Sequence, residues 1–88
     1  MLLDVTCKAG KLQVDNGLIR VQAPFSRTVW QVPCNLVTRI SRKDGMLAVD
    51  VTIHTDQAQY QAEMLTKANA SKLYALFPHL EVGATPIP

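Results

Sequence analysis

Apolar and polar residues alternate along most of the chain, which is typical of β-strands with one buried face. The clearest run is 47–54, where every second residue is Leu, Val or Ile. A second run, 59–64, follows the short polar stretch 55–57, and the two predict an antiparallel hairpin. The apolar face of the second strand is predicted to carry Tyr60, Ala62 and Met64.

Alternation predicts further strands nearer the N-terminus. Residues 3–7 indicate a first strand that ends by Gly10. The runs 12–14 and 19–23 flank Asn16-Gly17, and this pair tolerates the positive φ that a tight turn demands. We therefore expect a hairpin over 12–23.

The stretch 28–42 is also extended, and we interpret it as one bent strand. Pro33 interrupts it, because proline cannot donate to a central ladder and marks an edge, a bend or a bulge. The residues 43–45 then predict a turn that delivers the chain into a strand starting near Met46.

One segment changes its period and predicts a helix. Thr66 is suited to be its N-cap, 67–77 contains no Gly or Pro, and Pro78 ends it. Its apolar residues fall at i, i+3, i+4 and i+7, namely Ala70, Leu73, Tyr74 and Phe77. About three turns of helix cannot persist in water without packing, so this helix must cover a sheet. The core is expected to include Val49, Val51, Ile53, Tyr60 and Leu73.

Length and composition fit one folded domain over 1–80, with a loosely ordered tail over 81–88. The chain has 88 residues, of which 48% are hydrophobic and 18% charged, a globular balance. It lacks an apolar run long enough to span a membrane, and Asp4 lies where a signal peptide needs basic and apolar residues. These features predict a cytoplasmic protein. A core this small also makes self-association a possibility.

Successive antiparallel strands followed by one helix define an α+β fold, in which the helix plugs the open end of a curled sheet or crosses its apolar face. The segment Trp30-Gln31-Val32-Pro33 leading to 36–40, the hairpin from 47 to Tyr60, and the helix end at 73–77 resemble the pleckstrin-homology-like (PH-like) superfamily. The likeness is to its small bacterial PH-like and GRAM-type domains.

This resemblance implies a strongly bent antiparallel sheet, or a partly open barrel, of five to seven strands with one C-terminal helix. The pattern gives five or six strands where a complete PH barrel has seven. Either the segment 28–42 counts twice or the barrel is abbreviated. The tryptophan common near the end of that helix in eukaryotic PH domains is absent, and Phe77 is a candidate for its role.

Basic residues gather between Asp15 and Asp44, where the chain has no acid. They are Arg20, Arg27, Arg39, Arg42 and Lys43. By resemblance, PH domains that bind phosphoinositides use basic residues around an early hairpin, which makes Arg27, Arg42 and Lys43 candidate contacts for an anionic ligand. Alternation instead spreads these charges over two faces of a sheet, and we favour the interpretation that they form a solvated polar face.

Two aromatic residues have two interpretations each. Phe25 is either an exposed anchor for a partner or a membrane, or a side chain folded over the edge of the core, and we favour the core edge. Trp30 is either a core or an interface residue, and we favour burial because it shares a strand face with Val32.

The sequence carries no constellation typical of catalysis. His54 lies near Asp50 on the polar side of its strand, without an accompanying nucleophile or phosphate loop. Cys7 and Cys34 are far apart in the chain and are expected to be small buried side chains rather than a disulfide or a nucleophile. We predict no enzyme activity, no metal and no cofactor.

The leading hypothesis is a non-enzymatic interaction module that uses a sheet edge or the outer polar face to bind a protein partner or itself. The alternative is an adaptor that binds anionic lipid or phosphoinositide through the basic segment 20–43. The net charge is only +2, and few aromatic residues are available for stacking on bases, so no nucleic-acid partner is expected.

Overall fold

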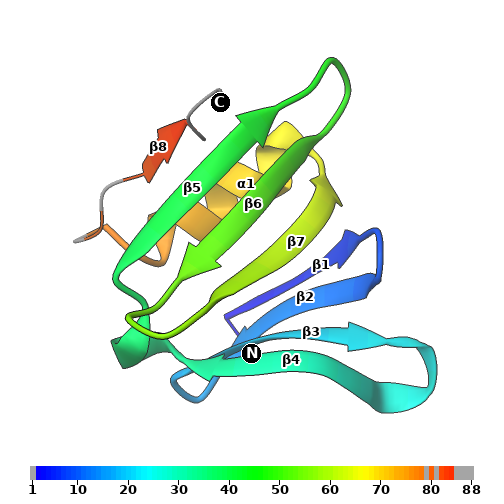
Figure 1. Ribbon diagram of the computed structural model, residues 1–88. Coiled ribbons are helices and arrows are strands. Elements are labelled where there is room, and N and C mark those ends of the chain that lie inside the picture. Colours follow the sequence, from blue (N-terminus) through cyan, green and yellow to red (C-terminus); the bar gives the residue numbers. More distant parts are fainter. Residues whose placement is uncertain (1, 79, 81, 85–88) are drawn as a thin grey trace.

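The chain folds into two β-sheets and one α-helix, as the computed structural model shows (Figure 1). The structure describes residues 2–78, 80 and 82–84. The first sheet is antiparallel throughout and follows chain order, with strands β1 (Leu3–Cys7), β2 (Gly10–Asp15), β3 (Leu18–Ala23) and β4 (Arg27–Pro33).

The second sheet has the order β7-β6-β5-β8. Its antiparallel strands are β5 (Arg39–Asp44), β6 (Val49–His54) and β7 (Gln59–Leu65). The short strand β8 (Val82–Ala84) pairs in parallel with β5. A loosely ordered tail was expected over 81–88; residues 82–84 of it form β8, and residues 81 and 85–88 lie outside the described residues. The predicted α+β class is confirmed.

The predicted hairpins and the helix N-cap are present. The β2–β3 turn places Asn16 and Gly17 at φ values of 49° and 75°, as the sequence predicts. Helix α1 (Lys67–Ala75) begins after Thr66, whose hydroxyl accepts the Asn69 N–H at 3.1 Å. One of the N–H groups that have no acceptor within the first turn of the helix thus bonds to the Thr66 side chain, as the sequence predicts.

The prediction of one bent strand over 28–42 is wrong. This stretch forms β4 and β5, which lie in different sheets and are separated by the 3-10 turn η2 (Cys34–Leu36). Pro33 has no N–H to extend the ladder, and the backbone N–H groups of Cys34 and Val37 hold the turn that follows it. Cys34 N–H donates to the Gly17 carbonyl at 2.7 Å, and Val37 N–H donates to the Cys34 carbonyl at 3.2 Å.

The turn expected at 43–45 lies later in the chain. β5 continues through Asp44, and the turn is closed by the Gly45 N–H donating to the Ala48 carbonyl at 2.8 Å. Met46 and Leu47 are therefore turn residues rather than strand residues, and their exposed fractions are 95% and 91%.

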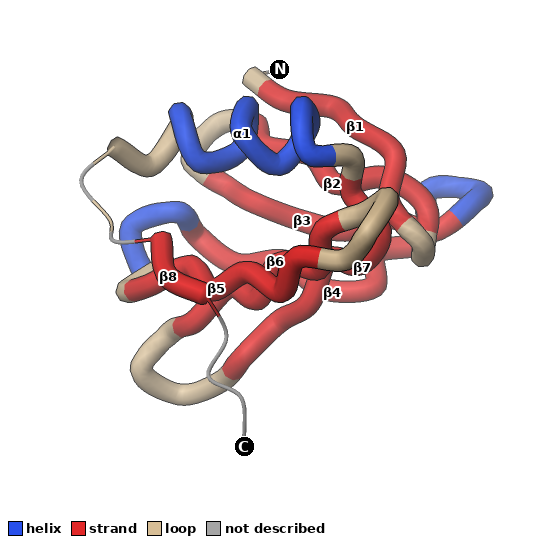
Figure 2. Tube along the Cα trace, turned by 90° about the horizontal axis from the view of Figure 1, so that it is seen from above, coloured by secondary structure: helices blue, strands red, loops and turns tan. Residues whose placement is uncertain are grey.

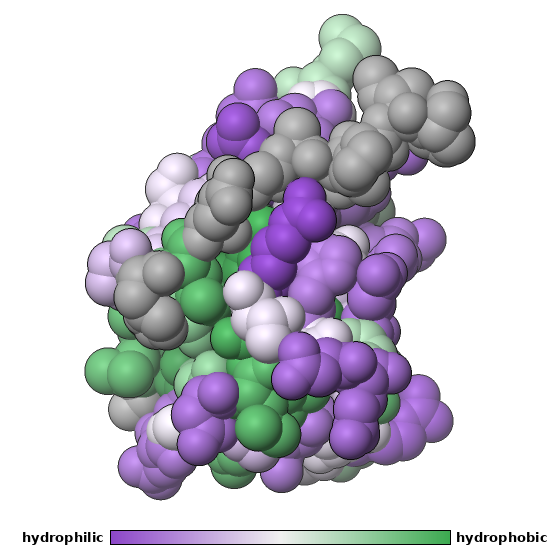
Figure 3. Space-filling model, turned by 60° about the vertical axis from the view of Figure 1, so that its left-hand side comes forward, coloured by the Kyte–Doolittle hydropathy of each residue, from purple (hydrophilic) through white to green (hydrophobic). Residues whose placement is uncertain are grey.

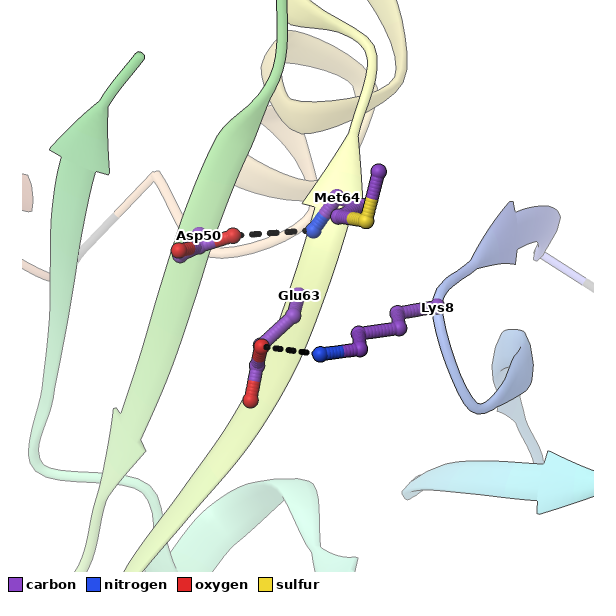
Figure 4. Close-up of polar contacts among 4 residues, drawn as sticks. All are labelled: Lys8, Asp50, Glu63 and Met64. Carbon is purple, nitrogen blue, oxygen red and sulfur yellow. Dashed lines mark hydrogen bonds and ion pairs between the residues drawn. The ribbon is translucent and has the colours of Figure 1, made fainter.

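Met64 does not share the buried face of β7. The β6–β7 register shifts between Val49 and Val51, and Met64 takes a φ of 59° with its side chain exposed. Its N–H donates to Asp50 Oδ1 at 2.9 Å (Figure 4). The shift turns the next residue, Leu65, into the core.

The core lies between the two sheets and α1. The helix contacts β1 and β6, one strand from each sheet, and runs along one side of the molecule in Figure 2. Four of the five residues predicted for the core are buried, namely Val49, Val51, Ile53 and Leu73. The fifth, Tyr60, packs at its margin and is half-buried.

The sheets approach each other where β1 meets β7. Lys8 N–H donates to the Glu63 carbonyl at 2.8 Å, and Lys8 Nζ lies 3.7 Å from Glu63 Oε2 (Figure 4). Trp30 adds a second link, because its indole N–H donates to the Gln61 carbonyl at 2.9 Å. Trp30 was expected to be buried; it is half-buried, with its ring centroid 5.3 Å from that of Tyr60. Despite these links, the two sheets are not joined by a continuous ladder in the described part of the chain.

Candidate functional site

The structure does not bring the three candidate anion contacts together. Arg27 is the first residue of β4, and Arg42 and Lys43 lie near the end of β5. The chain runs the whole length of β4, turns at η2 and follows most of β5 between them. Arg42 is also neutralised locally, because its Nε lies 3.5 Å from Asp44 Oδ2. The described residues therefore form no single basic cluster from these side chains.

The favoured interpretation of Phe25 is wrong. Phe25 lies in the 3-10 turn η1 (Pro24–Ser26) with a φ of 64°, and its side chain is fully exposed. Pro24 fixes the entry to the turn and Ser26 also has a positive φ, of 60°. The backbone thus directs the ring into solvent, which leaves Phe25 as a candidate contact residue.

A serine and a histidine that sequence analysis did not connect are hydrogen-bonded. Ser41 Oγ lies 2.6 Å from His54 Nε2, across the β5–β6 ladder. Burial, and then the charge of Arg39, lower the pKa of His54, which favours the neutral ring. A serine beside a histidine base can act as a nucleophile, but Ser41 is only 2% exposed. A serine this buried cannot reach an external substrate, so we interpret the hydrogen bond as one that orders the two side chains.

The two cysteines lie in different environments. Cys7 is buried in the core and Cys34 is half-buried in η2, and both are free thiols. Burial raises the pKa of the Cys34 thiol, which disfavours the reactive thiolate.

Apolar surface gathers around η2. Figure 3 turns toward the reader the left-hand side of Figure 1, and green surface gathers at its left and in its lower middle, with purple surface beside it. Two hollows flank the turn, and we name them together the η2 surface. Leu36, in this turn, is 55% exposed and lines the first of them.

The first hollow has a volume of about 210 Å³ and lies between the end of β4, η2 and the β6–β7 turn. Apolar side chains and a polar rim line it; they are Val32, Pro33, Leu36 and Tyr60, with Gln31, Thr55, Asp56 and Gln57. Asp56 is the one charged residue among those that the structure shows lining it. Apolar walls with a few polar groups at the rim are typical of binding hollows.

The second hollow, of about 320 Å³, is more apolar. It lies between η2, the N-terminal segment and the end of α1, where Leu2, Cys34, Leu76 and Phe77 contribute its apolar side chains. Leu2 is 69% exposed. Residues of η2 line both hollows, Leu36 the first and Cys34 and Asn35 the second.

Sequence analysis missed the η2 surface because it assigned 36–40 to a strand. The signal that it contained was Pro33 followed by Cys34-Asn35-Leu36, since a chain that must turn after a proline exposes part of the turn. Leu36 then faces solvent while Val37 enters the core.

The described residues contain no helix with the length and apolar character needed to cross a bilayer. Within the same residues, His, Cys, Asp and Glu side chains do not gather in threes where they could hold a metal ion.

Comparison of the chain with protein-family models, with curated proteins and with solved structures found no match. The function is therefore inferred from the chain's own residues.

Proposed function

We propose that this chain is a non-enzymatic, cytoplasmic interaction module that binds a protein, either a different partner or a second copy of itself, through the η2 surface. The observation that carries the proposal is the pair of hollows lined by residues of η2, together with the exposed Leu36 side chain in that turn. Contiguous exposed apolar surface with a polar rim marks interaction sites in proteins of this size.

We keep the PH-like resemblance as part of this proposal. The order of elements supports it: seven antiparallel strands in two sheets are followed by one helix, β8 being an addition. The segment 28–42 supplies two of those strands, which was one of the two alternatives that the sequence left open.

The free edge of β4 is less suited to binding than the η2 surface. β4 is the last strand of its sheet, but Val21 pairs with Trp30 and Gln22 with Thr28, which leaves Val29 as a bulged residue. Pro33 ends the strand. A bulge and a proline both interrupt the regular row of backbone groups that an added strand needs.

A photo-crosslinking residue placed at position 36 tests the proposal, with position 29 as the matched control. Leu36 and Val29 are both apolar and are 55% and 52% exposed, but only Leu36 lies on the η2 surface. We expect position 36 to give a defined adduct with one protein, or with the chain itself, and position 29 to give none. Identical adducts from both positions, or none from position 36, would contradict the proposal.

The alternative function, binding of anionic lipid, stays a prediction with a separate test. The distance along the fold between Arg27 and the pair Arg42 and Lys43 argues against a shared phosphate. We expect no cosedimentation with phosphoinositide liposomes, even at low salt, where exposed charges attract most strongly. Salt-sensitive binding that disappears when all three residues are replaced by Ser would favour the lipid adaptor instead.

A further inference from the structure

The turn between β5 and β6 carries two adjacent apolar side chains in solvent. Met46 and Leu47 are 95% and 91% exposed, and the hairpin that bears them projects beyond the neighbouring strands in Figure 1. Single exposed apolar residues are common on protein surfaces, but two neighbours at a projecting tip offer a compact apolar knob. We call residues 45–48 the β5–β6 tip.

The β5–β6 tip and the first hollow lie at opposite ends of the same sheet. The tip follows the last residue of β5, whereas η2 precedes its first residue. The β6–β7 turn, which forms the other wall of the hollow, is likewise at the far end of β6 from the tip. Each copy of the chain therefore presents the β5–β6 tip and the first hollow at opposite ends of this sheet.

The hollow is large enough for a side chain from the tip. Its volume is about 210 Å³, and a cavity of about 150 Å³ lined by apolar side chains already holds a benzene molecule. The apolar residues that line it, Val32, Pro33, Leu36 and Tyr60, suit the Leu47 side chain.

Each surface has beside it a charge that no ion pair neutralises within the described residues. Beside the tip, Asp44 is paired with Arg42, whose Nε lies 3.5 Å from Asp44 Oδ2, whereas Lys43 has no ion pair among the described residues. Asp56 lies on the rim of the hollow and likewise has no ion pair within the described part of the chain. A tip seated in the hollow of another copy would bring these unpaired charges toward each other.

We propose that copies of this chain associate head to tail, with the β5–β6 tip of one copy seated in the first hollow of the next. This inference rests on the proposed function, because the hollow is half of the η2 surface; it adds the identity of the partner and a second surface. A contact between two different surfaces does not close on itself, so it extends into a ring or an open chain of copies rather than ending at a dimer.

Sedimentation equilibrium of the purified chain over about 10 μM to 1 mM tests the proposal, since a contact this small is expected to be weak. We expect the average mass to rise steadily past that of a dimer. Leu47→Ser removes the knob and Leu36→Ser weakens the hollow, and each variant alone should stay monomeric. Val29→Ser, which changes an apolar residue of similar exposure outside both surfaces, should associate like the unmodified chain.

Mixing the two defective variants gives the sharpest result. The Leu36→Ser variant has an unchanged tip and the Leu47→Ser variant has an unchanged hollow, so the mixture should form a one-to-one dimer and no larger assembly. Charge reversal gives an independent check: Lys43→Glu and Asp56→Lys should each weaken association about tenfold, and the double variant should recover most of the loss.

A monomer at every concentration would overturn the head-to-tail proposal, as would a mixture of the two variants that stays monomeric. Neither result contradicts the proposed function if a crosslinker at position 36 still forms an adduct with a different protein. If position 36 gives no adduct while the chain associates through other residues, both proposals fail.

Discussion

Replacement of Leu73 by Ala tests whether α1 holds the two sheets together. Leu73 is 0% exposed, and its helix contacts β1 in one sheet and β6 in the other. Truncation removes buried methyl and methylene groups and leaves a cavity that the rigid sheets cannot fill, which costs about 3 to 5 kcal/mol for fully buried leucines. The total stability of an 88-residue chain is only about 4 to 13 kcal/mol.

The same substitution at exposed leucines provides matched controls. Leu47→Ala and Leu36→Ala remove identical atoms from side chains that are 91% and 55% exposed, and each should cost less than about 1 kcal/mol. Urea unfolding at one low protein concentration, where association does not contribute, measures all three. A loss of about 3 kcal/mol would also lower the melting temperature by more than about 12 °C in a domain of this size. A Leu73→Ala loss no larger than that of Leu47→Ala would refute the packing role assigned to the helix.

Three further predictions concern polar groups. Asp50→Ala should lower the free energy of unfolding by about 1 kcal/mol and speed amide hydrogen exchange at Met64, because the Met64 N–H loses its acceptor. Asp50→Asn keeps an acceptor and should lose less stability, so equal losses in the two variants would contradict this role. The Tyr74 hydroxyl is buried without a hydrogen-bond partner in the described residues, so Tyr74→Phe should raise stability by up to about 1 kcal/mol, and a clear loss by calorimetry would show that the hydroxyl is satisfied. Burial and the charge of Arg39 lower the pKa of His54 below its ordinary value of 6.5, so the unfolded chain binds a proton more readily than the folded chain. The contribution of His54 to stability should therefore be full above pH 6.5 and fall as the pH drops below it. In unfolding measured against pH, His54→Gln should make this fall smaller.

Local patterns predicted the parts of the fold that local forces decide. Thr66 caps its helix through its own hydroxyl, and Asn16-Gly17 tolerates positive φ without help from distant residues. Alternation likewise placed Val49, Val51 and Ile53 in the core, because a strand with one buried face has only two arrangements. These features require no knowledge of what lies opposite them.

The errors arise where the chain leaves a regular ladder. A one-residue shift against β6 exchanges the faces of Met64 and Leu65, and periodicity alone cannot detect such a shift. The division of 28–42 between two sheets depends on the Cys34 N–H reaching Gly17, a contact with an earlier hairpin. The η2 surface, which is our candidate site, depends on that same turn and was therefore beyond the reach of a strand pattern.

The nearest-neighbour order of the strands also has a consequence for how the chain folds. Each antiparallel ladder joins strands that follow one another in sequence, so every hairpin requires closure of only a short loop. The link between Lys8 and Glu63 instead joins residues that are 55 positions apart in the sequence, and β8 pairs with β5 although β6, β7 and α1 lie between them in the sequence. We therefore expect the two meanders to form early and separately, and the seam between β1 and β7 to be among the last contacts made during folding and among the first lost during unfolding.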